Sequence, residues 1–207
     1  MKMLGRGWQY TVYDLGNRRV LKKYNTWFDA YVVMLKDSFF HVRPPVFYFS
    51  RYYSDGQKSA ASSLIKLSET SLDAWVVGNP KVLSGCEYEQ DFVEPLSEYF
   101  ERVTVEDGKR MIDRFVEFTL LLLRSSVLEK NCNIADNFGL NDEGKIILID
   151  LGEICFVEEE IQDQIQKRVW AAPDVLSRLP IELRSYFVEE MDRVLGESSL
   201  QTVKNKG

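Results

Sequence analysis

The segment from Asn133 to Glu153, NIADNFGLNDEGKIILIDLGE, constrains the fold of this chain more than any other. Its apolar run at residues 146–149 predicts a β-strand that ends at an acidic residue in a glycine-containing turn. The sequence on both sides has the apolar spacing of amphipathic helices. A strand set between helices in this way indicates a mixed α and β fold.

The first half of the chain is predicted to be rich in strands. Strands are expected around residues 10–13 and 20–21, on either side of the turn LGNRR, and again at 44–53, 82–83 and 86–93. Helices are expected over residues 27–40 and 59–77, and GNP at 78–80 should stop the second one. We therefore assign residues 1–93 to a strand-rich N-terminal lobe.

The second half is predicted to be helical. Thr104 can cap a helix whose apolar stripe is formed by Met111, Ile112, Phe115, Val116, Thr119, Leu122 and Leu123. Later helices carry Ile161 and Ile165, and then Phe187 and Met191, at helical spacing. We assign residues 94–200 to a shortened helical C-terminal lobe and expect the tail 201–207 to be frayed. The fold class is α+β.

Composition narrows the class of protein. A net charge of -6 and a pI near 5.0 argue against a broad nucleic-acid surface. No apolar run is long enough to span a membrane. The three cysteines, an odd number at irregular spacing, indicate a reducing compartment and hence a cytoplasmic protein.

Two features near the N-terminus suit phosphate binding. Gly5 and Gly7 stand at a turn between strands, where small residues let backbone amides approach an anion. Lys22 follows on the next strand, and alternation places it on the opposite face from Lys23. The plain alternatives are an ordinary turn and a solvated lysine.

Together these motifs resemble those of the protein kinase superfamily, which also includes small-molecule phosphotransferases. GRGWQYTV resembles the glycine loop, with Tyr10 in place of its third glycine, and RVLK resembles the strand motif that carries the lysine. DLG, which begins at Asp150, resembles the metal-binding D-F-G, and Asn137 precedes Asp150 by the family's interval. The resemblance implies a bilobal kinase-like fold that binds ATP with Mg²⁺, the metal being held by Asn137 and Asp150.

The resemblance also implies roles for residues outside these motifs. Glu69 is the expected partner of Lys22, with a solvated helix charge as the alternative. The remaining expected nucleotide-binding residues are Val12, beside the glycine turn, and Asp91 and Val93, in the segment that resembles the hinge. The aromatic insert at residues 39–53 is expected either to fill the core or to bind a protein partner.

One position departs from the family pattern. Cys132 stands five residues before Asn137, where the family places its catalytic aspartate. A cysteine is a poor acceptor for a hydroxyl proton, and the alternatives are a packed side chain or a thiol nucleophile activated by Lys130. Asp136 is the fallback base. APD at residues 172–174 resembles the A-P-E element, or is simply a helix end broken by proline.

These expectations lead to two main functional hypotheses. In the first, the protein is a pseudokinase, which binds ATP and Mg²⁺ and acts through a partner. In the second, it is an active atypical phosphotransferase, acting on protein or on small molecules, with a displaced general base. A third possibility is a binding module of unrelated fold.

Overall fold

The computed structural model describes residues 1–37 and 46–196, which form two compact units. Unit 1 comprises residues 1–69, 77–92 and 151–153. Unit 2 comprises residues 70–76, 93–150 and the described residues from 154 onward. Unit 1 contains a five-stranded sheet, and most of the helices belong to unit 2. The mixed architecture confirms the predicted α+β class.

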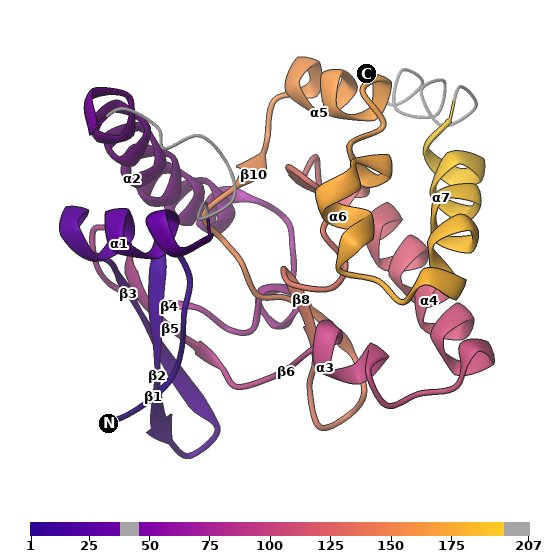
Figure 1. Ribbon diagram of the computed structural model, residues 1–207, viewed down its shortest axis with the longest axis horizontal. Coiled ribbons are helices and arrows are strands. Elements are labelled where there is room, and N and C mark those ends of the chain that lie inside the picture. Colours follow the sequence, from indigo (N-terminus) through magenta and orange to yellow (C-terminus); the bar gives the residue numbers. More distant parts are fainter. Residues whose placement is uncertain (38–45, 197–207) are drawn as a thin grey trace. The chain divides into compact units, whose positions relative to one another are not determined.

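The sheet of unit 1 is antiparallel throughout (Figure 1). Its strands are β1 Lys2–Arg6, β2 Tyr10–Gly16, β3 Arg19–Tyr24, β4 Lys81–Ser84 and β5 Glu87–Asp91, in the order β1-β2-β3-β5-β4. The predicted turn between β2 and β3 is present, and Gly16 and Asn17 have φ values of 74° and 50°. Glycine and asparagine tolerate this left-handed conformation better than other residues, which explains their place here.

Two helices lie between β3 and β4 in the chain. They are α1 Trp27–Asp37 and α2 Val46–Glu69. The first confirms the helix predicted over 27–40 as far as residue 37, and residues 38–45 lie outside the described ranges. The strand predicted over 44–53 is wrong from Val46 onward, because this part belongs to α2. Aromatic residues favour strands, but here Phe49 and Tyr53 are four positions apart on one helix face, and their rings contact each other.

The helix predicted over 59–77 is wrong at its end. α2 stops at Glu69, and a separate 3-10 helix, η1 Ala74–Val77, follows. Between them the Thr70 hydroxyl accepts the backbone N–H of Leu72 at 3.3 Å. Polar side chains that bond nearby backbone groups in this way compete with helix continuation. The regular apolar spacing across this segment concealed the break.

Unit 2 contains short strands and most of the helices (Figure 1). Its elements are β6 Glu94–Pro95, α3 Leu96–Phe100, α4 Val105–Arg124, β7 Leu128–Glu129, β8 Phe138–Leu140, β9 Ile146–Leu148, β10 Ile154–Cys155, α5 Glu158–Gln166, η2 Val169–Ala171, α6 Pro173–Ser177 and α7 Ile181–Leu195. The strands form two small antiparallel sheets, one of order β6-β8-β9 and one that pairs β7 with β10.

Helix α4 has the cap and the buried apolar stripe that its sequence predicts. The Thr104 hydroxyl caps it by accepting the backbone N–H of Asp107 at 3.2 Å. The predicted stripe is buried from Met111 to Leu122. Helix α7 packs against α4, with the rings of Phe115 and Phe187 6.0 Å apart. The predicted tail, 201–207, lies outside the described residues.

None of the helices in the described ranges is long and apolar enough to cross a membrane.

Candidate functional site

Three predicted nucleotide-binding residues lie in one row across the sheet of unit 1. Gly5 on β1 is opposite Val12 on β2, and Val12 is opposite Lys22 on β3. The row continues to Tyr88 on β5. Residues directly opposite in antiparallel strands have side chains on the same face of the sheet. The sheet therefore brings together Gly5, Val12 and Lys22.

Lys22 and Lys23 point to opposite faces, as predicted. Lys22 is buried, with its Nζ 5.8 Å from the centre of the Tyr88 ring, whereas Lys23 is exposed. A lysine ammonium over an aromatic ring is attracted by the π electrons of that ring. Burial therefore distinguishes Lys22 from an ordinary solvated strand lysine.

Asn25 fixes the shape of the glycine turn. Its side-chain Nδ2 donates to the carbonyl oxygens of Gly7 and Trp8 at 2.7 and 3.0 Å, and its backbone N–H donates to the Gln9 carbonyl at 2.8 Å. Its Oδ1 accepts the hydroxyl of Thr11 at 2.6 Å. Asn25 is buried, so these bonds are shielded from water. The turn is therefore held in place before any ligand binds.

The prediction that both glycines stand at the turn is wrong for Gly5, which lies within β1 and pairs with Val12. Gly5 and Gly7 nevertheless both have open space beside them. A Cβ atom added to Gly5 would meet no atom within 4 Å, and one added to Gly7 would meet only the Tyr10 carbonyl at 3.9 Å. Neither residue has positive φ. The internal structure of unit 1 therefore does not require glycine at either position. Close approach of a ligand to the backbone would require it.

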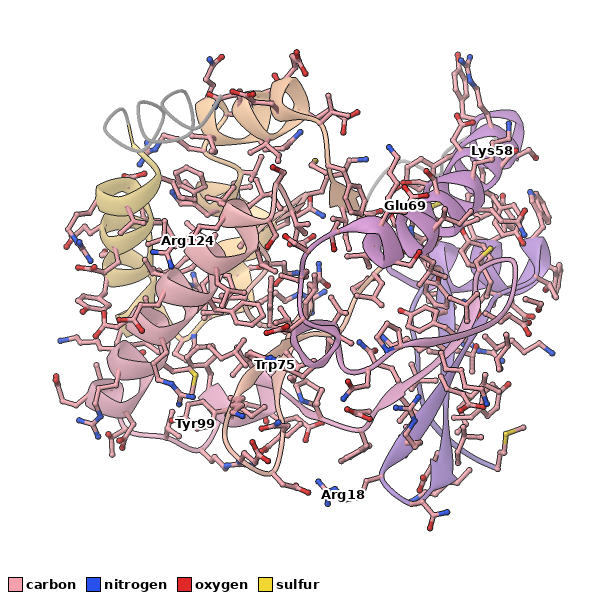
Figure 2. All side chains as sticks on the ribbon, turned by 180° about the vertical axis from the view of Figure 1, so that it is seen from behind. Arg18, Lys58, Glu69, Trp75, Tyr99 and Arg124 are labelled. Atoms are coloured by element: carbon pink, nitrogen blue, oxygen red, sulfur yellow. The ribbon has the colours of Figure 1, made fainter. Side chains whose placement is uncertain are left out.

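Other predicted residues of unit 1 make different contacts. Glu69 is exposed at the end of α2 (Figure 2), and no ion pair joins it to Lys22 among the described residues. The side chain of Asp91 is bound by Arg19 at 2.6 Å, and its backbone N–H donates to the Gly78 carbonyl at 2.8 Å. Asp91 thus has its polar groups engaged within unit 1. Val93 belongs to unit 2 and is buried.

Asn137 and Asp150 come together in unit 2. The hairpin of β8 and β9 lies between them in the chain, and the carbonyl oxygen of Asn137 accepts the backbone N–H groups of Ile149 at 2.8 Å and Asp150 at 3.4 Å. The β8–β9 pairing thus brings the backbone of Asp150 back beside that of Asn137. The predicted pair of oxygen-bearing side chains consequently starts from adjacent backbone.

An acidic residue, Glu129, lies beside this pair. It is 1% exposed, and its carboxylate accepts the backbone N–H groups of Asn131 at 3.2 Å and Asn133 at 2.9 Å. Burial raises the pKa of Glu129 to about 7, and the nearby negative charge of Asp150 adds to the rise. No lysine or arginine in the described part of the chain forms an ion pair with it.

Cys132 is a packed residue of this loop. Its side chain is 1% exposed, and its thiol donates to the Glu129 carbonyl at 3.6 Å. Burial raises the pKa of the Cys132 thiol well above its usual value, with further increases from the charges of Glu129 and Cys155. Burial of this thiol argues against the hypothesis that Lys130 activates it, because burial disfavours the thiolate.

Asp136, the fallback base, is engaged on two sides. Its carboxylate accepts a hydrogen bond from the Asn133 side chain at 3.2 Å and pairs with the Arg178 guanidinium at 3.2 Å. Arg178 follows α6, which begins at the Pro173 of the APD element. Asp136 therefore connects the loop to the segment after α6. A substrate hydroxyl would have to compete with the Arg178 guanidinium for the Asp136 carboxylate.

The side chains of Asn137 and Asp150 suit Mg²⁺ better than a transition metal. They offer an amide oxygen and a carboxylate, the hard ligands that Mg²⁺ takes together with water and phosphate oxygens. In the described ranges no group of three or more His, Cys, Asp and Glu side chains is arranged to hold a metal ion.

Two residues of this account could not be found from sequence. Asn25 has no motif, and Glu129 follows Val127 and Leu128 at the end of an apolar run where nothing indicates a buried acid.

Comparison with protein-family models finds no match to this chain, and comparison with curated proteins finds none either.

Proposed function

We propose that this protein binds ATP with Mg²⁺ as a kinase-like protein, and that it acts through a partner rather than by phosphoryl transfer. In this proposal the glycine turn and Lys22 contact the phosphates. Asn137 and Asp150 hold the metal. The observation that carries it is the backbone bonding of Asn137 to Asp150, because it makes neighbours of two residues whose side chains have the ligand chemistry of Mg²⁺.

A bilobal kinase-like architecture is part of the proposal. Protein kinases carry their phosphate-contacting lysine on the third strand, and the catalytic-loop Asn and D-F-G Asp hold their metal ions. Lys22 lies on β3, and the hairpin of β8 and β9 connects Asn137 to Asp150. These placements support the resemblance seen in the sequence.

Weak or absent transfer is proposed because neither Cys132 nor Asp136, the two predicted base positions, is well placed to accept a proton. Cys132 is buried, which raises the pKa of its thiol, and Asp136 is bound by Arg178. Mg²⁺ would supply electrostatic stabilisation of phosphate charge. The chain's own residues would bind and orient the nucleotide. Losing a general base costs on the order of 10²–10⁴ in rate.

The partner surface is proposed on α1 and α2. Phe28, Tyr48 and Tyr52 are exposed there by 68%, 73% and 53%. Large aromatic side chains on a surface are typical of protein interfaces. A cytoplasmic location is also proposed, because Cys86, Cys132 and Cys155 are all free thiols.

Calorimetric titration with ATP tests the proposal. We expect saturable binding with Mg²⁺ and weaker binding in EDTA. Radiolabelled ATP, incubated with the protein and with generic protein and small alcohol acceptors, should give little or no transfer. Robust transfer would favour an active phosphotransferase, and absence of binding at millimolar ATP would overturn the whole proposal.

A further inference from the structure

Cys132 has an unusual backbone conformation. Its φ is 48°, in the left-handed region that residues other than Gly, Asn and Asp rarely adopt. It lies in the loop between β7 and β8, five residues before Asn137. A conformation of this kind persists only where the surroundings hold it.

The carboxylate of Glu129 holds Cys132 in this conformation. The N–H groups on both sides of Cys132, those of Asn131 and Asn133, donate to the two carboxylate oxygens of Glu129, Oε1 at 3.2 Å and Oε2 at 2.9 Å. Successive N–H groups around a left-handed residue form a concave anion site. The anion in this loop is a side chain of the same chain, which enters the site from β7.

Backbone bonds continue from this loop to the proposed metal ligands. The Asn133 carbonyl accepts the N–H of Asn137 at 3.0 Å. The Asn137 carbonyl in turn accepts the N–H of Asp150 at 3.4 Å. The position of Asn133 therefore influences the backbone positions of both proposed metal ligands, Asn137 and Asp150.

We propose that Glu129 is a positioning residue for the metal site. Its carboxylate holds residues 131–133 in the left-handed turn and thereby sets the spacing of Asn137 and Asp150. This inference rests on the Mg²⁺ binding proposed above. Residues that orient metal ligands without touching the metal commonly govern metal affinity.

An apolar residue at position 129 would not perform this role. It would avoid the cost of burying a carboxylate, but both N–H groups would lose their acceptor. The buried acid is therefore best explained by the two donors that it accepts.

The first test compares Glu129→Gln with wild type. The amide has a similar shape but only one acceptor oxygen, so one of the two N–H groups loses its partner. Binding of Mn²⁺ in the presence of ATP, followed by electron paramagnetic resonance, should weaken by about 10- to 100-fold. The control is Asp192→Asn, which changes a structural carboxylate bound by Arg168 and Trp170. It should lower the melting temperature and leave Mn²⁺ affinity unchanged.

The second test is rescue. Glycine adopts positive φ without strain, so Cys132→Gly should restore most of the Mn²⁺ affinity to Glu129→Gln. The double variant should nevertheless melt at a lower temperature than Glu129→Gln, because it also loses a buried side chain. Affinity that rises while stability falls separates positioning from a merely structural role. Failure of the rescue overturns the role of the left-handed turn.

Wild-type protein provides a check that does not depend on how the variants fold. Hydrogen exchange should show the amides of Asn131 and Asn133 as strongly protected as those of β7, and fast exchange of both would overturn the proposal. If wild type binds no Mn²⁺ with ATP, the metal site fails and this role fails with it. If wild type binds and Glu129→Gln binds equally well, only the role of Glu129 is overturned.

Discussion

The backbone N–H of Asp150 donates to the carbonyl oxygen of Asn137 at 3.4 Å, although the two residues are thirteen positions apart in the chain. The hairpin of β8 and β9 accounts for this closeness, since each residue stands at one of its open ends. The backbones of the two residues that we propose as Mg²⁺ ligands are therefore adjacent.

Lys22→Ala is expected to weaken ATP binding by roughly 10- to 100-fold, the usual cost of losing a charged hydrogen bond. Lys23→Ala should change it by less than about twofold, because Lys23 is exposed on the other face of the sheet. Calorimetric titration of both variants measures the difference. Equal effects would show that Lys22 has no special role.

Gly5→Ala should leave stability unchanged or raise it by up to about 1 kcal/mol, since the added methyl meets nothing within 4 Å. ATP affinity should fall if phosphates approach the backbone at Gly5. The matched control is Gly139→Ala, whose Cβ would lie 2.6 Å from the Glu94 carbonyl oxygen. That variant should lose at least about 1 kcal/mol of stability. Urea titration measures stability, and unaltered ATP affinity in Gly5→Ala argues against a phosphate role for the turn.

Much of the fold could be predicted from local patterns. The Thr104 cap, the stripe on α4 and the turn at Gly16 each depend on neighbouring residues, which the sequence displays directly. The strand predicted over 44–53 failed from Val46 onward because its aromatic residues also suit a helix, and only the packing of Phe49 and Tyr53 decides between them.

The candidate site was predictable only in part. Lys22, Asn137 and Asp150 stand at intervals that a motif can specify. The contacts of Cys132 with Glu129 depend on a loop conformation in which Cys132 has a φ of 48°. No residue type in this loop predicts that conformation. Likewise, Glu69 fits the helix pattern, but α2 ends at that residue, where its side chain is exposed.

Cys132→Asp should destabilise the protein instead of creating an active kinase. The new carboxylate would be buried beside that of Glu129, without a cation to balance it. We expect a loss of several kcal/mol, against a smaller loss for Cys132→Ser. Thermal melts and radiolabelled transfer measure both effects. A stable, active Cys132→Asp would show that this position faces a substrate.

Glu129 should make the stability of the metal-free protein depend on pH. Its pKa is raised from 4.5 to about 7, so the native state retains a proton that the unfolded state releases. Its contribution to the free energy of unfolding is therefore complete below about pH 4.5 and is lost as the pH rises through about 7. The groups that face it are Asp150, Cys132 and Cys155.

From pH 5 to pH 8, wild type should lose on the order of 2 kcal/mol relative to Glu129→Gln, at 1.36 kcal/mol per pKa unit. Urea unfolding at the two pH values gives this difference, in which titrations common to both proteins cancel. Parallel pH profiles would mean that the Glu129 pKa is not raised.

The most direct measurement of the central claim is the thermal melt of wild type and Asp150→Ala with ATP, in Mg²⁺ and in EDTA. A ligand at 100 times its Kd stabilises a fold by about 2.7 kcal/mol, and each kcal/mol corresponds to roughly 2–4 °C for a protein of this size. We predict a rise of several degrees for wild type with Mg²⁺, most of which disappears in EDTA and in Asp150→Ala. No rise for wild type at millimolar ATP, or an equal rise in both proteins, would contradict the account.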